Sequence, residues 1–405
     1  MAKKAWLFGA VALLAALVAA AGVRLTRSVP SPSLTASMVM ASRQPSPAQI
    51  AWPAVPEAAV SIDGLGQTWT SGSQMPERPM ASVTKMMTAY LILRDHPLAA
   101  GQDGPTLTVS AADEEAYKDG ISNGDSGVAI KTGETLTERQ ALEALMLPSA
   151  DDIAWVLAEW DAGSRPAFAA KENTVARSLG MDHTNYTDPS GLSPTTVSTA
   201  ADQLKVVQAA MKNPTFAQIV SMQSATLPVA GTVVNYNRQT GTNGIVGIKT
   251  GTTSQAGGCW AFAIKREIGG RARTVYGVVF GAPLSPGNQQ AAAAIEDGED
   301  LADAMPKMMS QLTVLPAGTT IGEITVPWSK TQMPVVTSRA LSGMAVAGSR
   351  ITLNTHAQLP GGAGIAQDTE VGQVSANGVT GPAASTPVVT AGPVQKPSLM
   401  WKLFG

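Results

Sequence analysis

The pattern of apolar and polar positions along the chain predicts helices and strands that are interspersed. Apolar residues recur with the period of a helix over residues 83–94 (VTKMMTAYLILR), from Thr137 (TERQALEALML) and over residues 151–160 (DDIAWVLAEW). Stretches near Ala58 (AAVSID) and after Cys259 (CWAFAIKR) are typical of strands. Because these elements lack the regular alternation of a parallel βαβ sheet, we expect an α+β fold.

The N-terminal residues 1–26 have the pattern of an export signal or an N-terminal membrane anchor. Two lysines precede an apolar run over residues 5–23, which is followed by Arg24 and Arg27. The run is longer than a usual signal-peptide core and just reaches the length of a membrane span. Residues 19–21 (AAA) offer a cleavage site, and the cations on both sides leave cleavage and anchoring open. In both cases we expect the rest of the chain to work outside the cytoplasm.

The local composition of the sequence predicts three further regions and a tail. Residues 27–50, rich in Ser, Pro and Ala, predict a linker, and a globular region follows over residues 51–315. Residues 316–394 contain short strand-like runs and an internal echo, GEITV…PVVTS and GQVS…PVVTA, which predicts a small β-sandwich or barrel. For residues 395–405 (QKPSLMWKLFG), a short amphipathic membrane contact and a frayed terminus remain alternatives.

Composition and charge exclude several classes of function. The 405 residues are 44% hydrophobic, which argues against wholesale disorder, and a net charge of −2 without long charge runs gives no nucleic-acid footprint. A single cysteine rules out an intramolecular disulfide, and with three scattered histidines it leaves no structural zinc site. We therefore expect no metal and no cofactor. A Ser-His-Asp triad remains possible in principle, but no G-x-S-x-G elbow supports it.

The first candidate for chemistry is the Ser-x-x-Lys of Ser82 and Lys85. If a helix starts near Ala81, Ser82 lies at its N-terminus, where the helix dipole favours developing negative charge. Lys85 then lies one turn on and on the same face, and its apolar neighbours Met86 and Met87 exclude water and favour a neutral, basic amine. The alternative is that Ser82 is only a helix cap and Lys85 a solvated side chain.

The second candidate is Ser149-Ala150-Asp151, which comes before a predicted helix. Ser149 and Asp152 also have the spacing of a capping pair that opens this helix after Pro148. The two interpretations are compatible, because a serine at the mouth of a helix can also point into a cleft.

The tetrapeptide Ile-Lys-Thr-Gly occurs twice, and its flanks separate the two copies. The copy at residues 130–133 lies in a polar stretch before a capping box of Thr137 and Gln140, so we expect a turn with Lys131 in solvent. The copy at residues 248–251 follows apolar residues and predicts a strand. A lysine on a strand beside a cleft can bind a carboxylate, while backbone N–H groups polarise a carbonyl. The second copy is therefore the candidate.

Taken in order, three motifs with their flanks resemble the serine D-alanyl-D-alanine carboxypeptidases. These motifs are PMASVTKMMTAYLILRD, LMLPSADDIAWVLA and GIVGIKTGTTSQAGGC, and further matching stretches are NTVARSLGMDHTNYTDPSGL and VSTAADQL. The family comprises low-molecular-mass penicillin-binding proteins related to serine β-lactamases, and the resemblance covers roughly residues 51–310. It implies a β-lactamase/transpeptidase-like domain, an antiparallel sheet flanked by helices, followed by a small all-β domain. The family's Lys-x-Gly-Glu turn matches residues 131–134.

The resemblance also implies roles for individual residues. Ser82 would attack the D-Ala-D-Ala carbonyl and form an acyl-enzyme, Lys85 would be its base, and Ser149 would relay a proton to the leaving D-alanine. The implied substrate-binding residues are Asp151, Lys249, Thr250, Gly251 and Thr252. The N–H groups of Ser82 and Thr252 would form the oxyanion hole. The implied partners are peptidoglycan stem peptides, β-lactam antibiotics as covalent inhibitors, and the membrane through the N-terminal segment and a C-terminal amphipathic contact.

Two features depart from the pattern of this family. Asp151 stands where Asn is usual, and an ionised carboxylate only accepts hydrogen bonds, so it should repel a substrate carbonyl although it can pair with Lys85. At an acidic exterior, a protonated Asp151 would regain the donor. Residues 280–300 (FGAPLSPGNQQAAAAIEDGED) also lack the arginine that the family often has there. These departures keep two alternatives open: a serine β-lactamase, and a catalytically weak homologue that binds cell wall.

Overall fold

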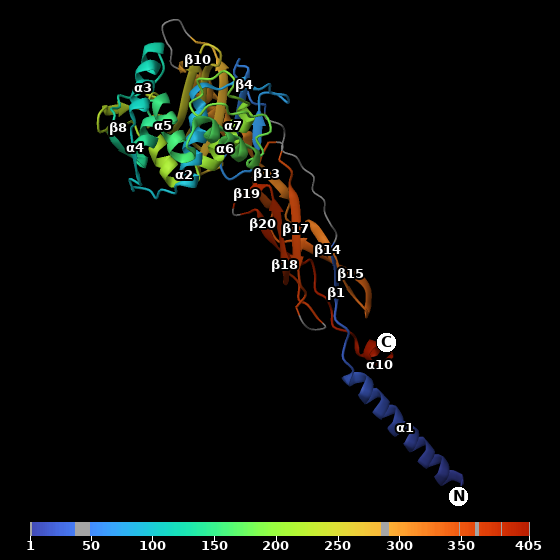
Figure 1. The fold of residues 1–405 in the computed structure, drawn as a ribbon. Coiled ribbons are helices and arrows are strands. Elements are labelled where there is room, and N and C mark those ends of the chain that lie inside the picture. Colours follow the sequence, from blue (N-terminus) through green and yellow to red (C-terminus); the bar gives the residue numbers. More distant parts are fainter. Residues whose placement is uncertain are drawn as a thin grey trace. The chain divides into compact units, whose positions relative to one another are not determined.

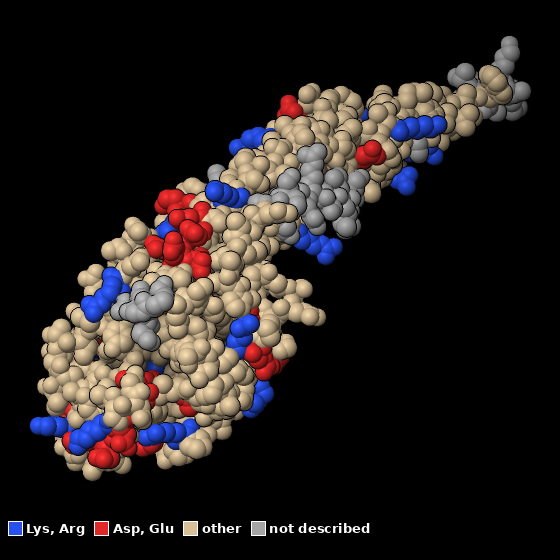
Figure 2. All heavy atoms as spheres, turned by 90° about the horizontal axis from the view of Figure 1, so that it is seen from above, with Lys and Arg blue, Asp and Glu red and all other residues tan. Residues whose placement is uncertain are grey.

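The computed structural model describes residues 2–36, 49–284, 291–347, 349–360, 364–381 and 383–404. The chain divides into two compact units (Figure 1). One unit is Gln49–Met308, and the other combines Met1–Ala48 with Met309–Gly405. We call them the α+β unit and the β unit. Each has its own hydrophobic core. Small groups of charged side chains are separated by wide uncharged areas in Figure 2, in line with a charged share of 14%.

The α+β unit is built on a five-stranded antiparallel sheet. In the order of the sheet, its strands are β10 (Ile245–Thr253), β11 (Gly257–Glu267), β12 (Ala272–Ala282), β2 (Glu57–Ile62) and β3 (Thr68–Thr70). Along β11, Cys259 and Ala261 belong to the main core, whereas Trp260 and Phe262 lie against Gly298 of helix α9 (Ala292–Ala304). Both faces of the sheet are therefore apolar, which explains the nearly continuous apolar run in this strand.

Helices and short two-stranded ribbons complete the α+β unit. The helices and 3-10 turns are η1 (Ala81–Thr84), α2 (Lys85–Asp95), α3 (Ala111–Asn123), α4 (Glu138–Met146), α5 (Asp151–Ala162), α6 (Arg165–Ser178), α7 (Ala200–Ala210), α8 (Pro214–Val220) and η2 (Met305–Met308). The ribbons pair β4 (Arg78–Pro79) with β7 (Val197–Ser198), β5 (Thr106–Thr108) with β6 (Thr135–Thr137), and β8 (Ser224–Leu227) with β9 (Gly231–Val234). The predicted α+β class is thus confirmed.

Local signals in the sequence explain where several elements begin. The predicted capping box of Thr137 and Gln140 opens α4, with both reciprocal hydrogen bonds present. The first Ile-Lys-Thr-Gly lies in a turn in which Lys131 is exposed, and the second lies in strand β10, as the flanks of each copy predict. Of residues 280–300, which lack the arginine, residues 285–290 lie outside the described part of the chain.

The β unit consists of two sheets that share one core. The larger sheet has the order β1 (Ser33–Ala36), β14 (Thr320–Val326), β15 (Ser329–Thr337), β20 (Ser385–Thr390), β18 (Glu370–Asn377) and β17 (Thr352–Ala357). The smaller sheet has the order β13 (Met309–Leu315), β16 (Leu341–Val346) and β19 (Val379–Thr380). Because core residues such as Ile324 and Ala345 come from both sheets, the unit is a β-sandwich, in agreement with the predicted all-β domain.

The internal echo of the sequence corresponds to a symmetric pairing at the centre of the larger sheet. The two Pro-Val-Val-Thr segments lie in β15 and β20, which are antiparallel neighbours with Val336 opposite Val389. Strand β14 flanks the first copy and β18 flanks the second, so each half of the echo supplies two strands. The repeat therefore builds one sheet from two similar halves.

The structure corrects two of the predicted boundaries. Residues 309–315, which we assign from sequence to the globular region before residue 316, form β13 and pair with β16 in the β unit. The predicted linker, residues 27–50, contains strand β1, which pairs with β14. A short strand carries little sequence signal, and its partner is decided by the fold rather than by its own residues. Beyond these strands, the β unit has helices α1 (Ala2–Thr26) and α10 (Leu399–Phe404).

Candidate active site

Lys85 is fully buried and its amine is held by three acceptors. Its Nζ donates to Ser82 Oγ at 2.9 Å, to Asp151 Oδ1 at 2.5 Å and to the Ser190 carbonyl at 2.8 Å. Three N–H groups are all that a lysine ammonium can donate. The alternative of a solvated Lys85 is therefore wrong.

Ser82 occupies the 3-10 turn η1 that leads into α2, close to the helix start expected at Ala81. The N-cap of this turn is Met80 rather than Ser82, so the alternative of Ser82 as a cap is not what the structure shows. Ala81 itself has a positive φ of 49°. A non-glycine residue in this region is uncommon and is often associated with a functional constraint.

Ser149 lies immediately before α5 in a second unusual backbone conformation. Its φ is 65° and its side chain is almost completely buried. The N-cap of α5 is Ala150, without a side-chain cap, so the predicted capping pair of Ser149 and Asp152 is wrong. The reason is that the Ala150 N–H donates to the Ala144 carbonyl at 3.1 Å, which closes a turn before α5. Ser149 lies inside this turn, one residue before the N-cap position.

Asp151 connects α5 to the loop that follows α3 and to Lys85. Its Oδ2 accepts from the Ser126 N–H at 3.1 Å, while its own N–H donates to the Ser126 carbonyl at 2.8 Å. Burial raises the pKa of the Asp151 carboxyl, and the adjacent Lys85 amine opposes that rise. The pairing with Lys85 that the sequence suggests for this departure from Asn is therefore present.

Strand β10 brings the second Ile-Lys-Thr-Gly against the turn that carries Ser82. A Cβ on Gly251 would lie 2.9 Å from the Ser82 nitrogen and 3.1 Å from the Val83 nitrogen, so only glycine fits this approach. Lys249 is buried, and its Nζ donates to the Thr250 carbonyl at 2.9 Å. Burial, together with the nearby Lys85 cation, holds the pKa of Lys249 well below its usual range. Thr252 continues the same strand.

Sequence reasoning misses the acceptor that Ser190 supplies and the residue that organises it. Asp188 Oδ2 accepts from the N–H groups of Ser190, Gly191 and Leu192 at 2.8–3.2 Å and from the Ser190 hydroxyl at 2.6 Å. This turn aims the Ser190 carbonyl at Lys85. The Asp-Pro-Ser-Gly string is a turn signature that can be recognised in the sequence, but the target of its carbonyl cannot.

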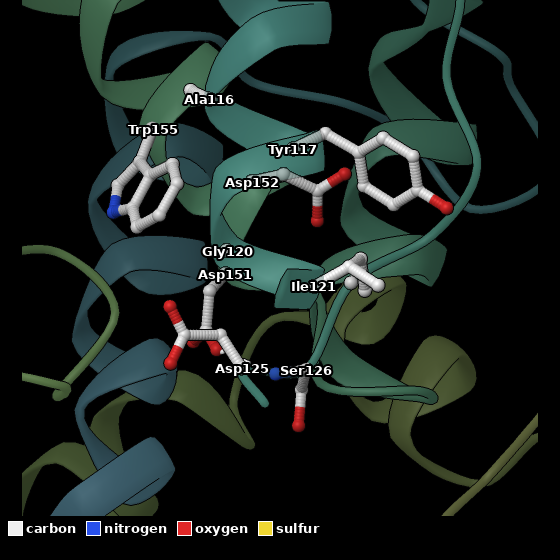
Figure 3. A pocket seen from close by; sticks show the side chains of 10 residues that line it. Ala116, Tyr117, Gly120, Ile121, Asp125, Ser126, Asp151, Asp152 and Trp155 are labelled. Carbon is white, nitrogen blue, oxygen red and sulfur yellow. Dashed lines mark hydrogen bonds between the residues drawn. The ribbon is translucent and has the colours of Figure 1, made fainter. Parts of the chain in front are cut away.

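A small acidic pocket lies beside Asp151 (Figure 3). It is lined by residues of α3 and α5 and of the loop that follows α3, and its carboxyl groups come from Asp125, Asp151 and Asp152. Within the described residues, Asp152 Oδ2 has no hydrogen-bond partner, while its Oδ1 accepts from the Val128 N–H at 3.4 Å. Burial raises the pKa of Asp152 to about 7. Among the same described residues, no group of three or more His, Cys, Asp or Glu is placed to hold a metal ion.

Comparison with known proteins agrees with this geometry. A family model described as D-alanyl-D-alanine carboxypeptidase matches residues 53–283, more than half of the chain. The chain belongs to this family. It is therefore a serine peptidase, and the β-lactamase alternative is not favoured.

Two relatives from this D-alanyl-D-alanine carboxypeptidase family match this chain over about 250 residues each. The D-alanyl-D-alanine carboxypeptidase of Streptomyces sp. (strain K15) is 31% identical over 251 residues, which are 58% of this chain and 82% of the relative. The carboxypeptidase DacB2 of Mycobacterium tuberculosis is 34% identical over 245 residues, which are 56% of this chain and 79% of the relative.

Solved structures place the fold in the same family. The Streptomyces K15 DD-transpeptidase has a TM-score of 0.54 at 28% identity and covers 63% of this chain and 98% of its own. Penicillin-binding protein 5 from Haemophilus influenzae has a TM-score of 0.58 at 20% identity and covers 87% of this chain and 100% of its own. The second likeness concerns the fold alone, and its coverage extends beyond the residues that the family model matches.

We predict that Gly251→Ala abolishes most of the acylation of this carboxypeptidase by penicillin, because the added methyl group must push β10 away from Ser82. Gly133→Ala, at the same place in the other Ile-Lys-Thr-Gly, is the matched control, since nothing lies within 4 Å of its Cβ position. Its positive φ of 82° leads us to expect a stability loss of about 1 kcal/mol but little change in acylation rate. Equal rates for the two variants would contradict the close approach of β10 to Ser82.

We predict that Asp152→Asn changes the pH dependence of stability. The folded-state pKa of about 7 lies above the usual value, so the native state keeps a proton that the unfolded state loses. The free energy of unfolding of the wild type, relative to that of the variant, is therefore highest below about pH 4. It falls by about 1.4 kcal/mol per pH unit up to about pH 7. Urea unfolding of both proteins from pH 4 to pH 8 measures this difference, and parallel curves would refute it.

Proposed function

We propose that this protein removes the terminal D-alanine from peptidoglycan stem pentapeptides through an acyl-enzyme on Ser82. The observation that carries the proposal is the buried Lys85 amine, 2.9 Å from Ser82 Oγ and oriented by two further acceptors. Membership of the family supports the reaction class, and the close approach of Gly251 to Ser82 supports β10 as the proposed substrate-binding strand.

In the proposed mechanism Ser82 Oγ attacks the carbonyl carbon of the D-Ala-D-Ala peptide bond. Neutral Lys85 takes the hydroxyl proton as the new C–O bond forms, and the N–H groups of Ser82 and Thr252 stabilise the oxyanion. Ser149 relays a proton to the nitrogen of the leaving D-alanine as the C–N bond breaks. Water then attacks the ester, releases the shortened peptide and restores the Ser82 hydroxyl.

Lys249 and Thr250 bind the terminal carboxylate in this proposal. Because burial and Lys85 hold the pKa of Lys249 low, the empty site disfavours the ammonium form. An arriving carboxylate stabilises that form, since an opposite charge within a few ångströms favours ionisation. The binding step therefore favours proton uptake at Lys249, and it selects substrates that carry a free carboxylate. In the same proposal, Asp151, Gly251 and Thr252 lie on the side of the site that the substrate occupies.

We further propose that the protein works outside the cytoplasm and is attached to the membrane. Helix α1 includes an apolar stretch, Phe8–Thr26, that is long enough to cross a bilayer. The apolar stretch of a signal sequence can have the same length and composition, so this stretch supports export more directly than anchoring. Peptidoglycan stem peptides lie outside the membrane, which agrees with an exported enzyme.

We predict that a fluorescent penicillin labels the wild type stably and that Ser82→Ala abolishes the label. Lys249→Ala should slow acylation by about 100-fold, corresponding to a loss of about 3 kcal/mol from the transition state, whereas Lys131→Ala should leave it unchanged. Gel fluorescence measures acylation by the penicillin, and release of D-alanine from a pentapeptide measures the carboxypeptidase reaction. Rapid turnover of the penicillin would favour a β-lactamase, and no labelling at all would favour a non-catalytic cell-wall-binding protein.

We predict that Asp151→Asn moves the acid limb of the acylation rate to lower pH. The carboxylate 2.5 Å from Lys85 Nζ stabilises the ammonium, which cannot accept the Ser82 proton, and an amide removes that stabilisation. Acylation rates of the two proteins from pH 4 to pH 9 give the comparison. If their profiles coincide, Asp151 does not control the protonation of the site, and its role at an acidic exterior is discarded.

A further inference from the structure

Helix α2 contacts two successive carbonyls of one turn. Lys85 Nζ donates to the Ser190 carbonyl at 2.8 Å. The Thr88 hydroxyl lies 2.6 Å from the carbonyl of the residue before it, Pro189. Lys85 and Thr88 are three residues apart in α2, so they lie on the same side of the helix. The contact of Thr88 therefore restrains the turn immediately beside the carbonyl that accepts from Lys85.

A carboxyl group from α6 lies against the Thr88 hydroxyl. Glu172 Oε1 is 3.0 Å from Thr88 Oγ1, and the Glu172 side chain is completely buried. Among the described residues no Lys, Arg or His forms an ion pair with it, since the neighbouring Lys171 pairs with Asp95 and Asp161. Within the same part of the chain, Glu172 Oε2 has no hydrogen-bond partner. A carboxylate at this position would be a buried charge without compensation, which is costly.

The two contacts of the Thr88 hydroxyl indicate that Glu172 is protonated. A hydroxyl carries one hydrogen and the Pro189 carbonyl only accepts, so the contact at 2.6 Å uses that hydrogen. Glu172 Oε1 then has to donate a proton to Thr88 Oγ1. Burial, together with the nearby Asp188 carboxylate, raises the pKa of Glu172 well above its usual value. The pKa of the nearby Tyr186 phenol is raised as well, above all by burial, so this group supplies no charge.

We propose that Glu172 is a neutral carboxylic acid that positions Lys85 from a distance. Glu172 donates to Thr88 Oγ1, and Thr88 donates to the Pro189 carbonyl. The turn held in this way presents its next carbonyl, that of Ser190, to the Lys85 amine. Glu172 is a positioning residue, because its contact is with Thr88 and not with the reacting atoms. The proposal rests on the proposed function, in which Lys85 is the base.

Loss of this arrangement changes two properties of the proposed reaction. Without the Thr88 hydroxyl the Pro189 carbonyl loses a donor inside the protein, and the turn can move away from Lys85. Misplacement of a reacting group by about 1 Å can lower a rate by about 100-fold. A weaker contact with the Ser190 carbonyl also stabilises the ammonium form of Lys85 less, which moves the acid limb of the rate to lower pH. The rate and its pH profile therefore both report the position of the turn.

The first test measures the protonation of Glu172 by infrared spectroscopy at neutral pH. In the difference between the wild type and Glu172→Gln, we expect loss of the C=O stretch of a protonated carboxyl group. Other protonated carboxyl groups, such as that of Asp152, cancel in this difference. Loss of carboxylate bands instead would overturn the proposal. Because the measurement needs no substrate, its result does not depend on the proposed reaction.

The second test compares two threonines in the same chemical situation. Thr88 and Thr215 are both completely buried, and each hydroxyl lies 2.6 Å from a backbone carbonyl, that of Pro189 and that of Leu98. Thr88→Val and Thr215→Val should therefore lose similar stability. Amide hydrogen exchange of residues 190–192 should become at least about threefold faster in Thr88→Val than in Thr215→Val. Equal exchange in the two variants would overturn the role of Thr88 in holding the turn.

The same pair of threonines separates positioning from stability in the acylation by penicillin. Per folded protein, Thr88→Val should acylate at least about 10-fold more slowly, with its acid limb at lower pH. Thr88→Ser restores the hydroxyl and should recover both properties, and Thr215→Val should retain them. An unshifted acid limb, with a loss of rate equal to that of Thr215→Val, would overturn the positioning role. A wild type that penicillin does not label would count against the proposed function, whereas hydrogen exchange still decides whether Thr88 holds the turn.

A pair of variants at Glu172 completes the test. Glu172→Gln keeps a neutral donor for Thr88 Oγ1, whereas Glu172→Met keeps the length of the side chain without a donor. We expect Glu172→Gln to acylate within about twofold of the wild type and Glu172→Met to be about fivefold slower. Glu172→Met should nevertheless unfold at no lower urea concentration than Glu172→Gln, because it leaves no buried polar atom unpaired. Equal acylation rates for the two variants would overturn the role of the Glu172 proton.

Discussion

The candidate active site depends on the burial of one amine, that of Lys85. A buried ammonium without partners is costly enough to be rare, and it persists only when each of its donors finds an acceptor. Here the acceptors come from three separate places: Ser82 in η1, Asp151 at the start of α5, and the Ser190 carbonyl in the turn organised by Asp188. The hydrogen bonds of this amine therefore fix the positions of three segments, and one of them carries Ser82, the proposed nucleophile.

The same requirement gives Asp151 two opposing effects. A carboxylate next to Lys85 compensates the burial of its charge more strongly than a neutral amide can, so it stabilises the resting arrangement. A base must be neutral before it can accept the Ser82 proton, and the carboxylate disfavours that state. Stability and reactivity therefore place different demands on residue 151, and its carboxylate restrains Lys85, the proposed base, more strongly than an amide would.

The sequence was sufficient for features that local chemistry determines and insufficient for those that the fold decides. The flanks of Lys131 and Lys249 separate a turn from a strand, and Thr137 with Gln140 predicts a capped helix that is present. The Ser190 carbonyl could not be predicted because every residue has a carbonyl, and only tertiary structure selects which one faces Lys85. The proposed cap at Ser149 failed for a related reason, since capping requires an extended residue and Ser149 has a φ of 65°. The pairings of β1 and β13 likewise depend on partners far away in the chain.

Two glycines explain how the turn that carries Ser82 is held between other segments of backbone. A Cβ on Gly251 would lie 2.9 Å from the Ser82 nitrogen, and one on Gly191 would lie 1.9 Å from the Ala81 carbonyl oxygen. Side chains at either position would separate η1 from β10 or from the turn that presents the Ser190 carbonyl. Because Ala81 has a positive φ of 49°, its conformation costs of order 1–2 kcal/mol and has to be maintained by its surroundings. The close approach that these glycines permit supplies those surroundings. The Gly of the second Ile-Lys-Thr-Gly is therefore needed for the position of Ser82 as well as for the strand that carries Lys249.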